Sequence, residues 1–199
     1  YTSGQGRMSN KQVPNNRMER ITGMSFTPEE NAVAITGIRK GQSDLFYMPL
    51  KNNRPDQITK DLYDDKEPIL STLGKNSGIL FLSNRNTPYI GENAKSDDFN
   101  EHFNLFLYRP SKGTNLLQLT KTNKPIKNAI PWGEEQFSFL QVEHGKQVRK
   151  IVEVVQRQEG DTIAIREAAP LPFTLLKQEF IQATNKVVEV ARLKNEIII

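Results

Sequence analysis

The residue types that most often carry enzyme chemistry are few in this sequence, and their spacing does not suit catalysis. The chain has two histidines, His102 and His144, and no cysteine, so it has neither a His-Glu-x-x-His zinc motif nor a thiol nucleophile. A hydrolase serine sits in a Gly-x-Ser-x-Gly turn, and the nearest match, Gly23 to Thr27, lacks the final glycine. We therefore predict that this chain is not an enzyme.

Closely spaced carboxylates are the other candidates for chemistry, because Ca²⁺ is held by carboxylate and carbonyl oxygens. Two groups qualify: Asp64 and Asp65 with Glu67, and Asp97 and Asp98 with Asn100 and Glu101. Neither has the Asp-x-Asp-x-Asp-Gly spacing of a dedicated calcium loop, and acidic side chains in loops are usually just solvated. We therefore expect no cofactor, and Asp64 and Asp65 are the first place to look for Ca²⁺.

The charge pattern argues against a nucleic-acid surface. The 27 Lys and Arg and the 23 Asp and Glu leave a net charge of +4, and basic residues are interspersed with acidic ones. No apolar run approaches the roughly 18 residues that a membrane helix needs. The partner that we expect is therefore protein, with no nucleic acid and no direct membrane span.

The elements that carry these residues are short strands that repeat. Residues 43–50 and 103–110 each form an apolar run, and each is followed by a polar turn and a second short run, 57–60 and 118–121, that ends in Ile-Thr-Lys or Leu-Thr-Lys. A hairpin pattern precedes each unit. The sequence therefore contains at least two copies of a four-stranded element.

The spacing of the copies indicates a β-propeller. Phe26 and Leu70 occupy equivalent hairpin positions and lie 44 residues apart. Leu45 and Leu105 lie 60 residues apart, and subtracting the 16 residues of a polar insertion, residues 87–102, restores 44. This step matches the roughly 40 to 45 residues of a four-stranded propeller blade, which stacks face to face with its neighbours.

The rest of the chain is less regular. Residues 1–20 are predicted to be a flexible arm, residues 21–168 the blades with a degenerate third unit, and residues 169–199 a partial blade or extension. In the last segment we favour a strand over residues 186–193, whereas residues 174–182 fit a helix or a strand. The apolar ending at Ile199 reads as mid-strand, so we expect a piece of a longer polypeptide.

The repeat resembles the WD-type repeats of the TolB-like β-propeller family. The resemblance covers about residues 20–155 and rests on runs such as Ile-Leu-Phe-Leu-Ser-Asn-Arg at 79–85 and Ser-Asp-Leu-Phe-Tyr at 43–47, followed by Gln-Ile-Thr or Gln-Leu-Thr. The usual Ser-Pro-Asp-Gly-Lys turn is replaced by Thr-Pro-Glu-Glu-Asn at 27–31 and Thr-Leu-Gly-Lys-Asn at 72–76. Similar repeats occur in large cell-envelope proteins of Gram-negative bacteria, which implies a periplasmic or outer-membrane-associated setting.

We predict an all-β fold, a partial β-propeller of about three four-stranded antiparallel blades followed by a short C-terminal helix or extra strands. A closed ring needs at least about four blades, so the remainder of its own propeller or another polypeptide would complete it. The predicted function is a non-enzymatic protein-interaction scaffold in a bacterial envelope complex. The alternative is a propeller accessory domain of a peptidase or other hydrolase whose catalytic domain lies outside this chain.

Four apolar side chains are the predicted partner contacts. Tyr89, Ile90 and Phe99 lie in the insertion, and long loops on repeat scaffolds often carry recognition. Trp132 lies between a proline and a glycine, where we expect an exposed turn. Other aromatic residues recur at equivalent positions in the units and are therefore predicted to pack in the core: Phe46, Tyr47, Phe81, Phe106 and Tyr108.

Overall fold

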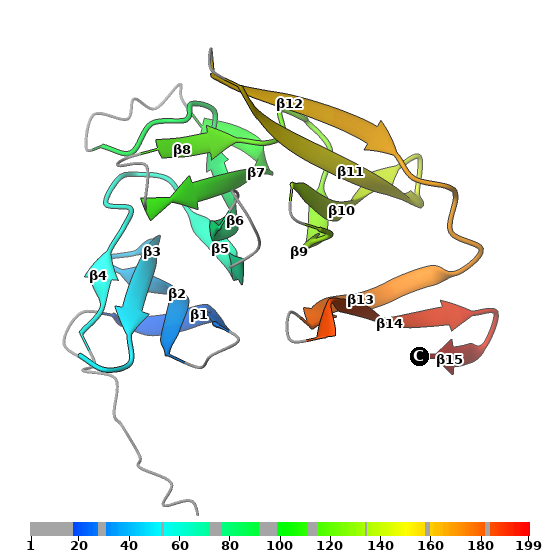
Figure 1. The fold of residues 1–199 in the computed structure, drawn as a ribbon, viewed down its shortest axis with the longest axis horizontal. Helices are drawn as coiled ribbons and strands as arrows, with labels where there is room; N and C mark the ends of the chain where they lie inside the picture. Colours follow the sequence, from blue (N-terminus) through cyan, green and yellow to red (C-terminus); the bar gives the residue numbers. More distant parts are fainter. Residues whose placement is uncertain are drawn as a thin grey trace, which may run out of the picture.

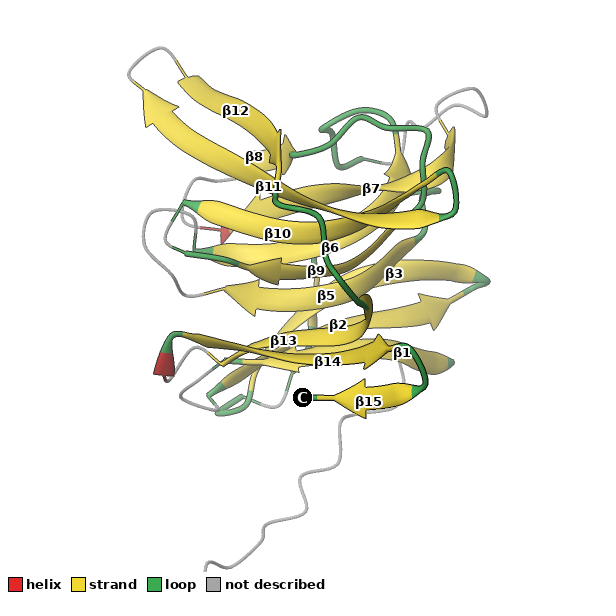
Figure 2. Cartoon of the chain, turned by 90° about the vertical axis from the view of Figure 1, so that its right-hand side faces the viewer, coloured by secondary structure: helices red, strands yellow, loops and turns green. Residues whose placement is uncertain are grey.

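The computed structural model describes residues 18–27, 31–52, 54–71, 77–91, 99–110, 115–133, 135–157, 160–181 and 184–199, which form four antiparallel sheets and no α-helix. The sheets follow one another along the chain and are arranged around a common axis (Figure 1). Seen from the side, they lie face to face in a stack (Figure 2). None of the described residues forms a helix long and apolar enough to cross a lipid bilayer.

Each sheet is a simple meander in which sequential strands pair. Sheet I contains β1 (Arg20–Phe26), β2 (Ala32–Arg39), β3 (Gln42–Pro49) and β4 (Asp56–Gln57). Sheet II contains β5 (Asp65–Ser71), β6 (Gly78–Arg85), β7 (Phe99–Arg109) and β8 (Asn115–Gln118). Sheet III contains β9 (Ile126–Pro131), β10 (Gln136–Glu143), β11 (Lys146–Arg157) and β12 (Gly160–Glu167), and sheet IV contains β13 (Thr174–Ile181), β14 (Lys186–Leu193) and β15 (Glu196–Ile198).

The internal repeat is confirmed by strand register. Ile35 pairs with Phe46 between β2 and β3, and Phe81 pairs with Phe106 between β6 and β7. Both faces of these central strands are apolar and buried. Sheet II packs between sheets I and III, whereas sheet I packs against sheet II on one face and has Met18 packed with Ile35 and Phe46 on the other. The prediction of about three four-stranded blades is confirmed by sheets I to III, and sheet IV adds a three-stranded partial blade.

The hydrophobic core is divided among the junctions between sheets. Eleven buried residues, among them Leu82, Leu105 and Phe139, join sheets II and III, and seven, among them Leu45 and Phe81, join sheets I and II. At the junction of sheets III and IV the buried cluster has only three members, Leu140, Leu175 and Ala191. Sheet IV is therefore held by a much smaller apolar contact than the others.

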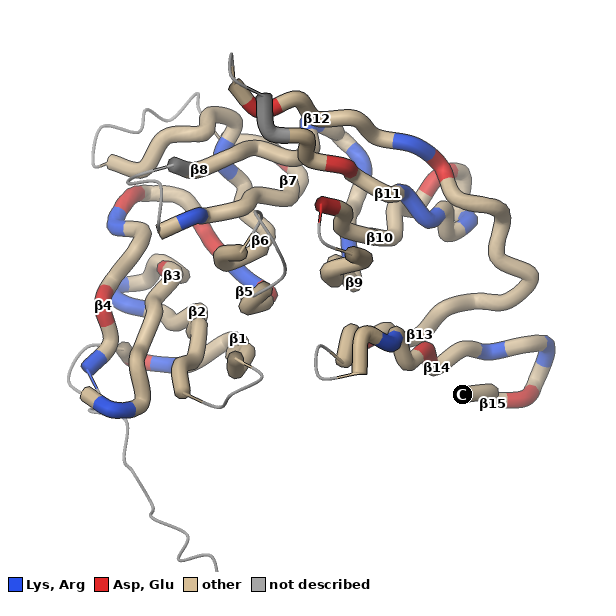
Figure 3. Tube along the Cα trace, in the orientation of Figure 1, with Lys and Arg blue, Asp and Glu red and all other residues tan. Residues whose placement is uncertain are grey.

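An arginine also bridges to a carboxylate at each junction. Arg85 of β6 binds Asp61, in the connection from sheet I to sheet II, at 3.2 Å, and Asp65 of β5 at 3.0 Å. Arg109 of β7 pairs with Asp161 of sheet III, and Arg149 of β11 pairs with Glu189 of sheet IV. These pairs fix the relative position of neighbouring sheets. Charges of both signs elsewhere are scattered over all four sheets (Figure 3).

One predicted boundary differs from the structure, and one open alternative is decided by it. Strand β7 begins at Phe99, which pairs with Arg85, so the last four residues of the predicted insertion, 99–102, extend a strand. Of the helix and the strand left open for the segment from Thr174, the structure has the strand, β13. A β-bulge between Leu175 and Lys177 shifts the side-chain alternation in β13, which is why its apolar spacing also fitted a helical face.

Candidate binding site on the central axis

The four innermost strands surround a cavity of about 680 Å³. Strands β1, β5, β9 and β13 are each the first strand of their sheet and pair with one neighbour only, so each presents a free edge. All four lie toward the centre of the molecule (Figure 1). The cavity is lined by residues 24–27, 68–70, 129–131 and 177–181, one run from each sheet.

Apolar side chains on β1 and β13 are unusually exposed beside this cavity. Met24 is 55% exposed and Phe26 is 50% exposed on β1, and Ile181 is 40% exposed at the end of β13. Met24 and Phe26 point to the same face because side chains alternate along a strand. Large apolar side chains that solvent reaches in a cavity bordered by edge strands are suited to bind another polypeptide.

The polar groups of the cavity hold the sheets in place. Ser25 Oγ of β1 accepts a hydrogen bond of 3.0 Å from the Leu70 N–H of β5. Gln178 of β13 is buried and donates through Nε2 to the Asn128 carbonyl at 2.5 Å, which ties sheet IV to sheet III. The titratable residues in the described lining are Lys177 and Glu179, which are exposed and lie 3.4 Å from each other. This lining supplies binding groups and no buried acid or base.

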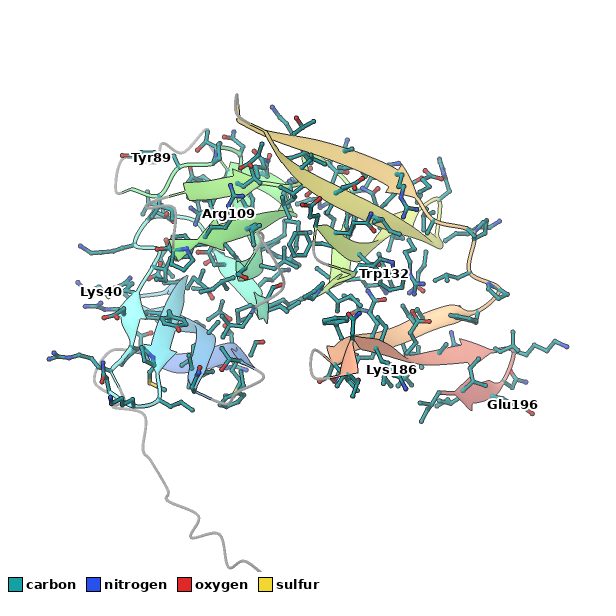
Figure 4. The ribbon with its side chains drawn as sticks, viewed as in Figure 1. Lys40, Tyr89, Arg109, Trp132, Lys186 and Glu196 are labelled. Carbon is teal, nitrogen blue, oxygen red and sulfur yellow. The ribbon has the colours of Figure 1, made fainter. Side chains whose placement is uncertain are left out.

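Three of the predicted contact residues lie on the outer side of the junction between sheets I and II. Tyr89 is 62% exposed, and its carbonyl accepts a hydrogen bond of 3.1 Å from Arg85 Nη1. Ile90 is half-buried against the apolar cluster between the two sheets. The Phe99 ring lies 5.2 Å from that of Tyr63 in a tilted arrangement. Ile90 and Phe99 thus already have packing partners, whereas the Tyr89 side chain extends from the surface (Figure 4).

Trp132 lies in a different place and is not fully exposed. It follows Pro131, which lines the axial cavity, and it is half-buried with the Arg149 guanidinium 5.0 Å from its ring centre. The structure therefore separates Trp132 from the insertion, although both were predicted contacts (Figure 4).

The acidic pair proposed for Ca²⁺ has protein partners. Both oxygens of Asp65, which is completely buried, accept hydrogen bonds from Arg85 Nη2 at 3.0 and 3.1 Å, and Asp64 Oδ1 accepts one from the Ser43 N–H at 3.1 Å. Burial raises the pKa of Asp65 to about 6, against the opposing effect of Arg85. A cation would have to displace Arg85. Among the described residues no group of three His, Cys, Asp or Glu could hold a metal ion, and Asp97 and Asp98 lie outside those residues.

Sequence reasoning missed the exposed residues of the axial cavity. Phe26 served only as a marker of the repeat, and Met24 and Ile181 were not considered. The available signal was the same-face pair of Met24 and Phe26 in the first strand of a sheet. That signal does not reveal that β13, about 150 residues away, lines the same cavity.

Comparisons with known proteins bear on the fold. No protein-family model and no curated protein sequence matches the chain. A solved structure from Agrobacterium tumefaciens, assigned as TolB, aligns with a TM-score of 0.57 and 12% identity over 87% of this chain and 55% of that one. The tricorn protease aligns with a TM-score of 0.35 and 9% identity over 85% of this chain and 22% of that one, a score too low to establish a shared fold. The chain thus spans about half the length of the TolB structure, and its fold is that of a TolB-like β-propeller.

Proposed function

We propose that this chain is a non-enzymatic protein-interaction scaffold that binds an extended polypeptide segment in its axial cavity. The observation that carries the proposal is the convergence of four free strand edges on one cavity of about 680 Å³. An extended segment adds to such an edge through backbone hydrogen bonds, and its alternate side chains fill apolar pockets. Met24, Phe26 and Ile181 are the side chains that such a segment would cover.

The absence of catalysis is part of the proposal. It is supported by the described lining, whose titratable residues are one exposed lysine and one exposed glutamate paired with each other. Catalytic groups usually need burial or close neighbours to shift their pKa toward the working pH. The two histidines offer no support for catalysis, because His102 lies in β7 and His144 in the turn between β10 and β11.

We propose a periplasmic or outer-membrane-associated complex as the setting. The support is the likeness of the fold to that of the Agrobacterium protein assigned as TolB, together with the repeat pattern. Fractionation of cells that express the full-length gene tests the setting, because we expect the protein in the envelope fraction. Recovery in the cytosol alone would contradict it.

Site-specific photo-crosslinking tests the binding mode. A photoreactive amino acid is placed at Phe26, at Ile181 or, as a control, at Ile165, which is 50% exposed on β12, the outermost strand of sheet III. We expect the same partner to be crosslinked from Phe26 and Ile181 and not from Ile165, and we expect the partner to be uncleaved after incubation with the protein. Equal crosslinking from all three positions would contradict binding in the cavity, and a cleaved partner would contradict the non-enzymatic role.

A further inference from the structure

A second cavity lies apart from the axis, at the end of sheet I where the chain passes from β4 to β5. It has a volume of about 320 Å³, and six of its lining residues matter here: Arg39, Lys40, Gln42, Asp44, Lys60 and Asp61. Lys40 is on the outer side of sheet I, away from the axial cavity (Figure 4). A ligand in this cavity would therefore not compete for the axial one.

Two oxygen atoms of residues that line this cavity have no hydrogen-bond partner in the described part of the chain. Asp44 is only 4% exposed, and its Oδ2 accepts a hydrogen bond of 2.9 Å from Gln57 Nε2, while its Oδ1 accepts none. Gln42 Oε1 is likewise buried without a donor. Buried acceptors without donors are uncommon in folded proteins because they lose their hydrogen bonds to water. Both atoms call for a ligand that donates hydrogen bonds.

The internal repeat shows what a satisfied version of this position looks like. Asn104 of β7 corresponds to Asp44, and its Oδ1 accepts hydrogen bonds from Thr120 Oγ1 at 3.0 Å and from the Thr122 N–H at 2.8 Å. Its Nδ2 donates to the Thr122 carbonyl at 3.2 Å. A cavity of about 480 Å³ at the same place in sheet II is lined by Asn104, Lys121 and Thr122. Both sheets thus have a cavity here, but the side-chain oxygen at this position has protein donors in sheet II and none in sheet I.

The hydroxyl of one threonine explains why Asn104 Oδ1 has a donor and Asp44 Oδ1 does not. Thr59, the counterpart of Thr120, accepts a hydrogen bond of 2.8 Å from the Leu45 N–H, as Thr120 does from the Leu105 N–H at 2.8 Å. The hydroxyl of Thr59 is hydrogen-bonded to Asp65, whereas that of Thr120 donates to Asn104. Asp44 therefore lacks the donor that its counterpart has.

The charges around Asp44 favour a positively charged donor. Asp61 and Asp65 lie near enough to add negative potential, and Arg85 is bound to both of them. Arg39 donates to Gln57 Oε1 at 2.8 Å, so it is already engaged. Burial, followed by Asp65 and Asp61, raises the pKa of Asp44 to about 7, and Gln57 and Arg39 oppose the rise.

The mouth of the same cavity has the opposite charge. Lys40 and Lys60 are exposed and line it. A simple cation would approach these two lysines at a cost, whereas a ligand with a carboxylate beside its ammonium group would gain from them. The lining therefore combines two buried acceptor atoms with two exposed lysines.

We propose that the sheet I cavity binds a small zwitterion of the free α-amino acid class. The ammonium group donates to Asp44 Oδ1 and Gln42 Oε1, and the carboxylate faces Lys40 and Lys60. Binding requires ionised Asp44, so it releases a proton below about pH 7, and affinity should fall about tenfold for each pH unit below that value.

Calorimetric titration of the full chain with glycine, leucine, methylamine and acetate at pH 8 and pH 6 tests the assignment. We expect the amino acids to bind more tightly than methylamine or acetate, and more tightly at pH 8 than at pH 6. Methylamine binding as tightly as glycine would show that the ligand carboxylate contributes nothing, and would overturn the assignment to a zwitterion. No binding of either amino acid, or pH-independent binding, would overturn the site.

Two matched variants assign the residues. Asp44→Asn, which copies the Asn104 position, should fold and lose more than about tenfold in affinity, because a charged acceptor is removed. Lys60→Ala should weaken amino-acid binding but not methylamine binding, whereas Lys121→Ala, its counterpart in sheet II, should change neither. Binding retained in Asp44→Asn, or equal effects of the two lysine variants, would overturn the proposal. If Asp44→Asn does not fold, the comparison of Lys60→Ala with Lys121→Ala still tests the proposal.

Discussion

The buried carboxylates between sheets I and II place ionisable groups where their charge is costly. Asp44 and Asp65 are 4% and 0% exposed, and burial raises their pKa values to about 7 and about 6 from 3.8. In the folded state both therefore hold protons more tightly than in the unfolded state. Their contribution to stability is favourable at low pH and is lost as pH rises through about 6 to 7, opposite to the usual behaviour of acidic residues.

Because ionised Asp44 destabilises the folded state, replacing it with a neutral residue should be stabilising at high pH. Asp44→Asn should raise the free energy of unfolding by about 2 kcal/mol at pH 8, because it removes a buried charge with an unpartnered oxygen. It should change stability much less at pH 4, where Asp44 is protonated in the folded state and only partly ionised in the unfolded state. Urea unfolding at the two pH values measures this, and a gain of the same size at both would contradict it.

Arg85 gives the second prediction at the residue scale. It is completely buried, binds Asp61 and Asp65, and has the Tyr63 ring 5.1 Å away. Arg85→Met should lower the free energy of unfolding at pH 8 by about 3–5 kcal/mol, because two carboxylates lose their buried counter-charge. Arg166→Met, on the exposed side of β12, is the control and should stay within about 0.5 kcal/mol of the wild type. Equal effects would show that Arg85 is not a structural ion-pair partner.

At the scale of the elements, sheet IV is attached less firmly than the other sheets. Its buried apolar contact to sheet III consists of Leu140, Leu175 and Ala191, supplemented by the pair of Arg149 and Glu189. The junction of sheets II and III has eleven buried members. Sheet IV should therefore open at a lower free energy than the rest of the molecule.

Hydrogen exchange tests this difference. Backbone amides of β13 and β14 should exchange faster than those of β6 and β7. Ala191→Asp places a charge in the small contact and should speed exchange throughout sheet IV, whereas Val188→Asp, at a position 39% exposed on β14, should not. Uniform protection across the four sheets would contradict a separately opening sheet IV.

At the scale of the whole molecule, the axial cavity exists because four sheets share an axis. Met24 and Phe26 reach it from one end of the chain and Ile181 from near the other. Because the side chains of Met24 and Phe26 are about half exposed, they contribute little to the core. Substitutions of Met24 and Phe26 should therefore weaken partner binding with little effect on the stability of the fold.

The matching prediction uses the double variant Met24→Asp and Phe26→Asp. It should shift Tm by no more than a few degrees and weaken binding of the crosslinked partner more than about tenfold, because both apolar contacts are lost. Calorimetry and a binding titration measure the two effects. Loss of stability equal to the loss of binding would show that β1 is a core strand and not a contact surface.

Local patterns in the sequence determined the strands, the repeat and the blade type. Side-chain alternation and turn residues act over a few positions, so the step from Phe26 to Leu70 and the strand over residues 186–193 could be predicted. The sequence could not decide between a helix and a strand at residues 174–182 because a bulge shifts the alternation in β13. A one-residue irregularity is invisible to a periodicity argument.

Only the tertiary structure decided which residues meet. Three features depend on how one sheet lies against the next. They are the edge strands around the axis, the partial packing of Ile90, Phe99 and Trp132, and the buried network of Asp44, Asp61, Asp65 and Arg85. That arrangement is set by contacts between residues tens of positions apart, which no local pattern encodes. The sequence by itself determined that Asp44 and Asn104 are equivalent positions, and the packing of the Thr59 hydroxyl against Asp65 decided that only Asp44 keeps an oxygen without a donor.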